Sequence, residues 1–412
     1  MDDEQGTRPV AARSALTAGR VLVGMASAVV LVATGTAYSN VEGLSMGIIK
    51  SEAIPANAPK STNGAVNILL MGLDSRKDQN GNPLPPEILD KLHAGTSDDG
   101  GYNTNTLILL HVPNNGSRAT AISIPRDDYV DVQGIRGYKN IKIKEAYGLA
   151  KYFAEQDLNK KGVNDRHTVE QQAREAGRKK SIETVRDFLG GIPIDHFAEL
   201  NLAGFYDLAT ALDGVEVCLN NPVKDDYSGA DFHAGRQTLD GAQALAFVRQ
   251  RHNLTNGDLD RTRRQQAFLT SAAHKLRTVG VFNDPGKLRK LIDVVKRDVV
   301  IDSGVDAFGF AQQAHALSGG NVDFVTLPID HYARDDSGQD INLVDVPKIQ
   351  AMVRDLISEK PSDVPQSRPA PVDPLSTTPA QQGTLPPSTE VATPDAVPNG
   401  NTISGGDIPC VD

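Results

Sequence analysis

Residues 105–125 read NTLILLHVPNNGSRATAISIP, and this stretch carries the strongest fold signal in the chain. Two apolar runs rich in β-favouring residues, 105–113 and 118–125, flank the segment Asn-Asn-Gly-Ser. Asn-Gly is a strong hairpin signal because both residues tolerate positive φ. The pattern therefore predicts an antiparallel strand pair at the heart of a sheet. A third apolar run at residues 66–74, VNILLMGLD, predicts a further strand.

Strand-like and helix-like patterns continue to alternate over residues 64–360, which is typical of an α/β domain. The polar stretch 159–180 is expected to be a surface insertion, with a helix that has a solvated charged face as the alternative. Helical periodicity occurs at residues 181–189, 201–212, 261–276, 285–295 and 344–357. Further strands are expected at residues 214–219 and 322–329.

The N-terminus carries a candidate membrane anchor. Residues 21–39 are uncharged and apolar, and at ~1.5 Å rise per residue a helix of this length spans a hydrocarbon layer of ~30 Å. Positive charges precede this run, so residues 1–20 are expected to be cytoplasmic, residues 40–63 a linker and the α/β domain extracytoplasmic. A cleaved signal peptide is the alternative, because small residues occur at 33–37. The preceding charges are Arg8, Arg13 and Arg20.

The C-terminus changes abruptly in composition. Residues 361–412 are rich in Pro, Ser, Thr and Gln, which predicts a disordered tail because such a segment buries too little apolar surface to offset its chain entropy. The chain has two cysteines, Cys218 and Cys410. In an oxidising exterior a disulfide between them would pin the end of the tail to the domain. A buried free thiol together with an intermolecular cysteine is the alternative.

The chain is acidic, with a formal net charge of -10. Nucleic-acid binding needs a basic field along one face, so no nucleic-acid partner is expected. Any anion site must instead be a local concentration of arginine. The first candidate lies in Ser-Ile-Pro-Arg-Asp at residues 123–127, where Pro125 ends a buried strand and holds Arg126 and Asp127 at the edge of the sheet.

The second candidate reads RQRHNLTNGDLDRTRRQQ from Arg249 onward. Arg249 and Arg251 are two residues apart, so an extended backbone points both guanidinium groups the same way. Asp258 stands where a helix would begin, and Arg261 and Gln265 follow on one face of it. A helix N-terminus flanked by arginines suits a phosphate or pyrophosphate, because the planar guanidinium binds phosphate oxygens bidentately.

The same charges also have a purely structural interpretation, as solvated helix residues in surface ion pairs worth less than ~1 kcal/mol. Arg263 and Arg264 in particular are expected to face solvent or to pair with Asp258 and Asp260. Composition alone leaves both interpretations open.

The segments SIPRD, GRQTLDGAQALAFVRQRH and GDLDRTRRQQAF, in this order, resemble the LytR-CpsA-Psr family. That family's recurring pattern is an arginine after the third strand, an R-x-R pair and D-x-x-R-x-x-R-Q. The resemblance extends over residues 66–316. It implies a mixed central sheet sandwiched by helices, and a hydrophobic groove for a polyprenyl chain with a pyrophosphate at its mouth. The implied pyrophosphate-binding residues are Arg126, Arg249, Arg251, Arg261 and Gln265.

Members of the family hold Mg²⁺ or Mn²⁺ through two aspartates, so the resemblance also implies a metal. Asp74 matches the first aspartate. The second belongs to a segment like R-S-D-T, which reads Asn-Thr-Asn-Thr at residues 103–106 here. Either Asn105 still coordinates, with the pyrophosphate supplying the charge, or Asp98 or Asp99 substitutes.

The resemblance implies that the chain transfers a phosphate-linked glycopolymer from polyprenyl pyrophosphate to peptidoglycan, with arabinogalactan or another secondary wall polymer favoured. In the expected mechanism the arginines and metal neutralise the pyrophosphate while an acceptor hydroxyl attacks the sugar-proximal phosphorus. Asp258 is the candidate base, with helix N-cap as its other role. The expected catalytic residues are Arg126, Arg249, Arg251, Asp258 and Arg261.

Two other functions remain open at this point. A pyrophosphatase would use the same phosphate-binding groups with water as the acceptor. A non-catalytic regulator or lipid-binding envelope protein is the second, and asparagine at both Asn103 and Asn105 favours it, because the family has arginine and aspartate there.

Overall fold

The structure is a computed structural model, and it describes residues 47–97, 101–115, 117–250, 252–254, 257–278, 284–305, 322–358, 402–404 and 408–412. None of the helices in these residues is both long and apolar enough to cross a membrane. The expected cytoplasmic tail and anchor, residues 1–39, lie outside the described residues, as does most of the tail from residue 361.

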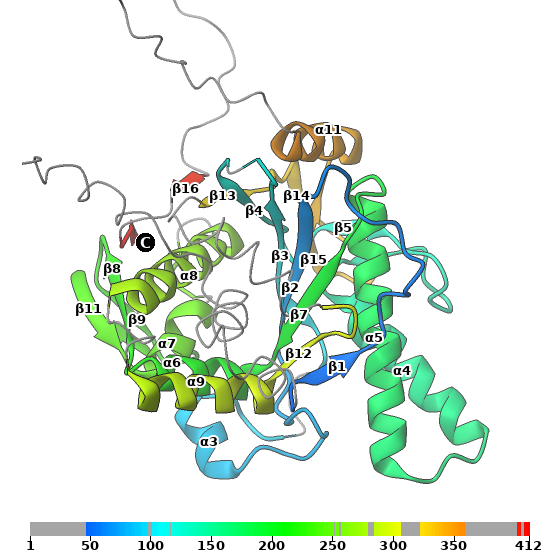
Figure 1. Ribbon diagram of the computed structural model, residues 1–412, viewed down its shortest axis with the longest axis horizontal. Coiled ribbons are helices and arrows are strands. Elements are labelled where there is room, and N and C mark those ends of the chain that lie inside the picture. The colour runs from blue at the N-terminus through cyan, green and yellow to red at the C-terminus, as the bar shows by residue number, and fades with distance from the viewer. Residues whose placement is uncertain are drawn as a thin grey trace, which may run out of the picture.

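A mixed eight-stranded sheet forms the centre of the molecule (Figure 1). β3 (Thr104–Val112) pairs antiparallel with β4 (Ala119–Ser123), which confirms the predicted hairpin. β2 (Val66–Leu73) pairs antiparallel with β3 and parallel with β7 (His196–Leu200). The strand order is β1-β12-β7-β2-β3-β4-β13-β16. The other strands of this sheet are β1 (Ile49–Ser51), β12 (Val299–Asp302), β13 (Val322–Thr326) and β16 (Thr402–Ser404).

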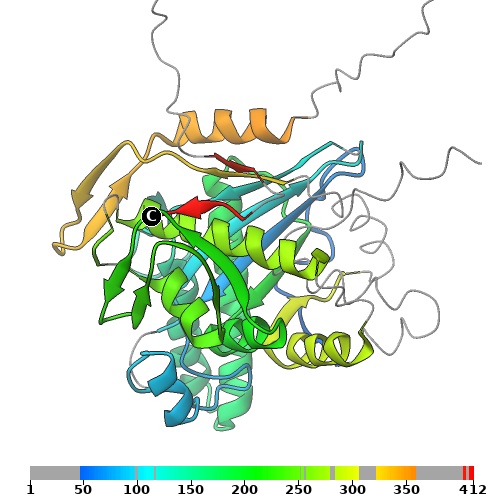
Figure 2. The ribbon, with the colours of Figure 1, turned by 90° about the vertical axis from the view of Figure 1, so that its left-hand side faces the viewer.

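Helices cover both faces of the sheet, which makes three layers (Figures 1 and 2). Successive side chains of a strand point to opposite faces, so Leu69 packs in the core beneath α5 and α11, whereas Leu70 packs with Leu269 of α8 on the other face. All five predicted helices are present. Three more helices, α3, α4 and α7, were not predicted. The helices of the described residues are α3 (Pro86–Lys91), α4 (Glu145–Lys160), α5 (Arg166–Phe188), α6 (Leu202–Ala211), α7 (Gly241–Arg249), α8 (Asp258–Thr278), α9 (Pro285–Asp298) and α11 (Val346–Ile357).

The polar stretch 159–180 is not a surface insertion, so that prediction is wrong. It forms the end of α4 and most of α5, and two arginines of α5, Arg174 and Arg178, are buried. Arg178 donates to both carboxylate oxygens of Glu199 on β7, at 2.8 and 3.0 Å. Arg174 donates to Glu170 at 2.7 Å. Both buried arginines are paired and hydrogen-bonded. A charged helix face can be buried under this condition, because the partners offset the cost of removing the charges from water.

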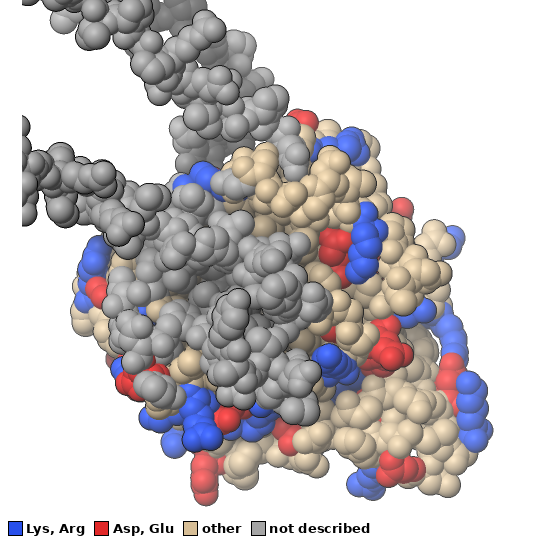
Figure 3. Space-filling view, viewed as in Figure 1, with Lys and Arg blue, Asp and Glu red and all other residues tan. Residues whose placement is uncertain are grey.

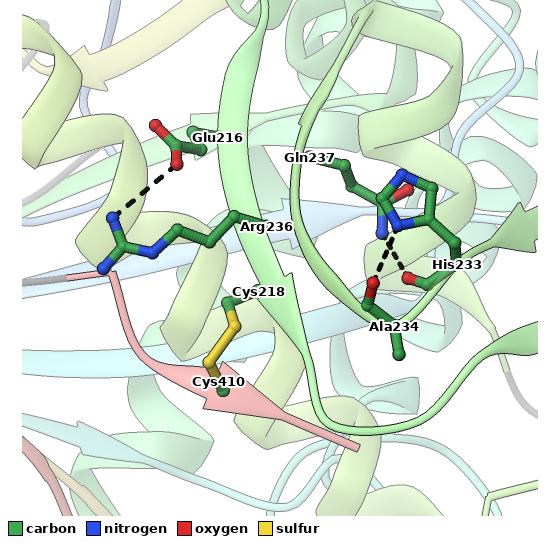
Figure 4. The surroundings of a disulfide bond; sticks show 7 residues. All are labelled: Glu216, Cys218, His233, Ala234, Arg236, Gln237 and Cys410. Carbon is green, nitrogen blue, oxygen red and sulfur yellow. Dashed lines mark hydrogen bonds and ion pairs between the residues drawn. A yellow bond between two sulfur atoms is a disulfide. The ribbon is translucent and has the colours of Figure 1, made fainter.

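A small three-stranded sheet lies beside α8 and contains β8 (Val215–Leu219) between β11 (Gly235–Leu239) and β17 (Cys410–Val411). A disulfide joins Cys218 of β8 to Cys410 of β17, with a Cα–Cα distance of 4.3 Å (Figure 4). The remaining strands are β5 (Tyr129–Asp131), β6 (Asn140–Lys142), β9 (Val223–Asp225), β10 (Ala230–Phe232), β14 (His331–Arg334) and β15 (Asp340–Leu343).

The predicted disordered tail, 361–412, needs a correction at its far end. Residues 402–404 form β16 and pair antiparallel with β13, and residues 410–411 form β17 and pair parallel with β8 (Figure 2). Ile408 and Val411 are buried. Prediction from average composition missed these short apolar segments, which each add a strand to the edge of an existing sheet.

Candidate functional site

A cavity of about 480 Å³ lies where the end of β2 and the start of β3 face α6, α7 and α8. Its volume falls within the range of ligand-binding sites. One wall is polar and carries most of the predicted site residues: Asp74, Asn105, Arg126, Arg249, Arg261 and Gln265. The apolar part of the lining, here called the apolar wall, consists of Leu73, Leu200, Leu202, Phe205, Leu245, Val248, Phe268 and Leu269.

Arg126 reaches the cavity because the chain leaves β4 through Pro125 and turns at the sheet edge. Its side chain is buried, and its guanidinium donates to Asn105 Oδ1 at 2.6 Å and lies 3.3 Å from Asp127 Oδ2. Burial lowers the pKa of Arg126, while Asp127 and Asp74 oppose that shift. The arginine remains charged, since guanidinium does not lose its proton in proteins. A buried cation is therefore fixed in place at the polar wall.

Asp74 follows β2 directly and is held by backbone and side chain together. Its backbone N–H donates to Asn103 O at 3.0 Å. Its carboxylate accepts from Arg76 at 3.1 Å and from Asn105 Nδ2 at 2.9 Å. Asn105 therefore bridges the carboxylate of Asp74 and the guanidinium of Arg126.

Arg249 is the last residue of α7, a helix whose start is fixed by a capping box between Asp240 and Gln243. It donates to Leu92 O at 2.9 Å, and burial lowers its pKa, whereas Asp74 opposes the shift. The backbone becomes extended only at Gln250, so Arg249 itself is helical, unlike the extended arrangement predicted for the Arg-x-Arg pair.

The electrostatics of Asp127 indicate that several cations converge on this wall. Burial alone would raise the pKa of Asp127, but Arg126, Lys144 and Arg261 together hold it below its usual value. Lys144 forms an ion pair with Asp127. By contrast, on the described part of the outer face in Figure 3, Lys and Arg are interspersed with Asp and Glu. Five basic side chains line the cavity together with the carboxylates of Asp74 and Asp225; the five are Arg76, Arg126, Lys144, Arg249 and Arg261.

Two predicted site residues cannot be placed. Arg251 and the side chain of Asp258 lie outside what the structure describes, although α8 does begin at Asp258. Gln265 lines the cavity and donates to Val248 O at 3.4 Å. Its neighbour Gln266 is buried and binds hydroxyl groups of the sheet instead.

Arg263 pairs with Asp260 at 3.3 Å, as one of the sequence-based alternatives expected. Arg264 does not face solvent, so that expectation is wrong. It is fully buried and donates to Asp412 O at 2.7 Å and to Gln250. The local pattern gave no sign of this, because Asp412 is far away in sequence.

The sequence also missed several residues of the polar wall. Arg76 stands two residues after Asp74, and this spacing was a usable signal. Lys144 had none, because it reaches the site only through the folding of β5 against β6. The rim formed by the turn after β9 and the segment after α7 gave no signal either. The lining residues missed there are Asp225, Tyr227, Ser228 and His252.

Asp74 and Asn105 are the lining residues that would hold a divalent metal. The described residues contain no group of three or more His, Cys, Asp or Glu arranged to hold a metal ion. Mg²⁺ commonly uses one or two carboxylates and completes its shell with substrate phosphates and water. The carboxylate of Asp74 fits that mode, provided that the substrate brings phosphate, whereas the amide oxygen of Asn105 accepts from Arg126 here and would have to turn toward a metal to bind it. Asp98 and Asp99, the alternative ligands, lie outside the described residues.

A cavity lined by both cations and apolar side chains suits an anionic head group that carries a hydrophobic chain. The chain belongs to the LytR_cpsA_psr family, whose model matches residues 35–357.

Relatives are consistent with this class. The chain is 40% identical over 374 residues to the cell wall biosynthesis protein LcpA of Corynebacterium glutamicum, covering 89% of this chain and 70% of that protein. It is 30% identical over 233 residues to the polyisoprenyl-teichoic acid–peptidoglycan teichoic acid transferase TagU of Enterococcus faecalis, covering 55% and 67%. Protein gbs0355 of Streptococcus agalactiae has a similar structure, with a TM-score of 0.52 at 19% identity over 73% of this chain and 90% of that one. At that identity the likeness concerns the fold alone.

Proposed function

We propose that this protein transfers a phosphate-linked glycopolymer from a polyprenyl-pyrophosphate carrier to peptidoglycan during cell-wall assembly. The observation that carries the proposal is the convergence of Arg126, Arg249 and Arg261 on one cavity that also has an apolar wall. Membership of the family supports it, as does the name of the relative TagU, a teichoic acid transferase acting on peptidoglycan. The proposal includes anchoring by residues 21–39, with the α/β domain outside the membrane.

The two walls suit the two halves of such a donor. The arginines would bind the pyrophosphate oxygens, and Phe205 and Phe268 would contact the first isoprene units. A second apolar cavity of about 20 Å³ shares Leu200 and Leu269 with the main one and lies between the sheet and α6, α8 and α9. The shared leucines place apolar side chains next to the main cavity, on the side where we propose that the polyprenyl chain lies.

The reaction forms one bond and breaks another at a single phosphorus. An acceptor hydroxyl oxygen bonds to the sugar-proximal phosphorus, the bond from that phosphorus to the bridging oxygen breaks, and polyprenyl phosphate leaves with the electron pair. The hydroxyl proton passes to a base. Buried Arg126, held by Asn105 and Asp127, is preorganised to stabilise the charge that develops, which is the main requirement of phosphoryl transfer. Mg²⁺ or Mn²⁺ bound through Asp74 and Asn105 would supply further positive charge.

Reconstitution with the full chain in detergent tests this function. Polyprenyl-pyrophosphate oligosaccharide and peptidoglycan fragments are supplied, and the phosphodiester conjugate is measured by mass spectrometry. Arg126→Ala is expected to lower the rate of conjugate formation by about 10²- to 10³-fold, because it removes a preorganised charge at the reacting group. Arg334→Ala is the control, since Arg334 is exposed, pairs with Asp340 at 3.0 Å and does not line the cavity.

Full conjugate formation by a folded Arg126→Ala protein would contradict the assignment of the cavity. Release of free phospho-oligosaccharide by the wild type, with no conjugate, would identify water as the acceptor and the protein as a pyrophosphatase.

A further inference from the structure

The rim of the cavity contains a buried carboxylate, that of Asp225. Asp225 ends β9, and its side chain is almost fully buried. Its carboxylate accepts from the backbone N–H of Tyr227 at 3.0 Å and from the hydroxyl of Ser228 at 2.9 Å. His252 Nδ1 lies 3.4 Å from Asp225 Oδ1. The carboxylate is thus fixed on one side by the turn and faces an imidazole on the other.

His252 itself is half exposed and lines the same cavity, three residues after Arg249. Its ring lies against the ring of Tyr227, with centroids 4.3 Å apart and planes at 34°. One edge of the imidazole therefore faces a buried carboxylate, and one face rests on an aromatic ring. Such a setting restricts ring rotation while leaving part of the ring open to the cavity.

We propose that His252, oriented by Asp225, is the base that takes the proton from the acceptor hydroxyl; this inference rests on the function proposed above. With Nδ1–H directed at Asp225, the lone pair of the imidazole is on Nε2, the nitrogen left for a substrate. As the acceptor oxygen bonds to phosphorus, its proton moves to Nε2, and polyprenyl phosphate leaves. Asp225 stabilises the imidazolium beside the cationic Arg249, and the proton is released to water afterwards.

Other groups of the cavity are engaged differently. Asp74 accepts from Arg76 and Asn105, and Lys144 is paired with Asp127, so each already serves the charge balance of the polar wall. Asp258, the base suggested by the sequence, begins α8, and its side chain lies outside the described residues. His252 combines access to the cavity with a buried carboxylate next to its Nδ1, which is the arrangement of a nucleophile-activating base.

Chemical rescue tests the proposal in the reconstituted transfer reaction. His252→Ala is expected to lower the rate of conjugate formation by about 10²- to 10⁴-fold, the range for a lost general base. Added imidazole is expected to restore part of the rate, and the restored rate should increase with the basicity of substituted imidazoles. Asp225→Asn should lower kcat with little change in KM. His331→Ala is the matched control, because His331 also faces an aspartate, Asp330 at 2.8 Å, but does not line the cavity.

Three results would overturn the inference: a His252→Ala protein with the full rate, a loss that no imidazole restores, or an imidazole effect in His331→Ala. If His252→Ala is fully active while Arg126→Ala is inactive, the proposed function stands and only the role of His252 is lost. If the wild type forms no conjugate, both the proposed transfer function and the role of His252 are refuted.

Discussion

Asn105 donates to Asp74 and accepts from Arg126, at a position where the family resemblance leads us to expect aspartate. Asn105→Asp is therefore expected to tighten Mn²⁺ binding by about tenfold, because a second carboxylate adds charge to the ligand set. Isothermal titration calorimetry of the full chain with Mn²⁺ measures this. Asp74→Asn is expected to abolish binding in both backgrounds, and an Asp74→Asn protein that binds as tightly as the wild type would refute the metal site.

For single residues, the sequence predicted the site residues that belong to recognisable motifs. It missed those that short strands and turns bring to the cavity. Asp74, Arg126 and Arg261 follow a strand end or a helix start, so their positions were predictable. Lys144 and Asp225 arrive through short strands and turns, whose geometry is not visible in a local pattern.

α5 shows at the scale of an element why periodicity failed for residues 159–180. Its buried face contains charges, and a hydrophobic pattern cannot report a face that is stabilised by ion pairs. The partner of Arg178 is Glu199, which lies on a strand of the central sheet. The paired strands β2, β3 and β4 carried clear apolar runs, and they were predicted correctly.

Removing one side of this pair tests its contribution. Arg178→Ala is expected to lower the free energy of unfolding by about 3 to 5 kcal/mol, because Glu199 would be left as an unpaired buried charge. Arg178→Met combined with Glu199→Met should recover most of the loss. Urea denaturation followed by circular dichroism gives the values. Arg186→Ala, an exposed arginine of the same helix, should change stability by less than about 1 kcal/mol; equal losses for Arg178 and Arg186 would contradict the account.

For the whole molecule, the covalent link between Cys218 and Cys410 closes a loop across a sequence separation of 192. Cys410→Ser is expected to lower the free energy of unfolding by about 5 kcal/mol, because the unfolded chain regains the entropy that the loop removes. Unfolding in urea without reductant measures the difference. Treating the wild type with dithiothreitol should give the same loss, while a variant as stable as the wild type would show that the link adds nothing.

The paired cysteines were one of two alternatives open from the sequence, because a chain with two thiols in an oxidising compartment favours a bond without fixing it. The strands that bring them together were not predicted. β17 completes the sheet of β8, and Arg264 of α8 donates to Asp412, so the far end of the chain packs next to the helix that lines the cavity.

The order of synthesis separates the two halves of this disulfide and of this strand pair. The ribosome makes Cys410 long after Cys218, and at 5 to 20 residues per second the interval is about 10 to 40 s. During that interval β8 has an open edge and an unpaired sulfhydryl. A newly made chain is therefore most exposed to wrong pairing with its neighbours just before its last strand arrives.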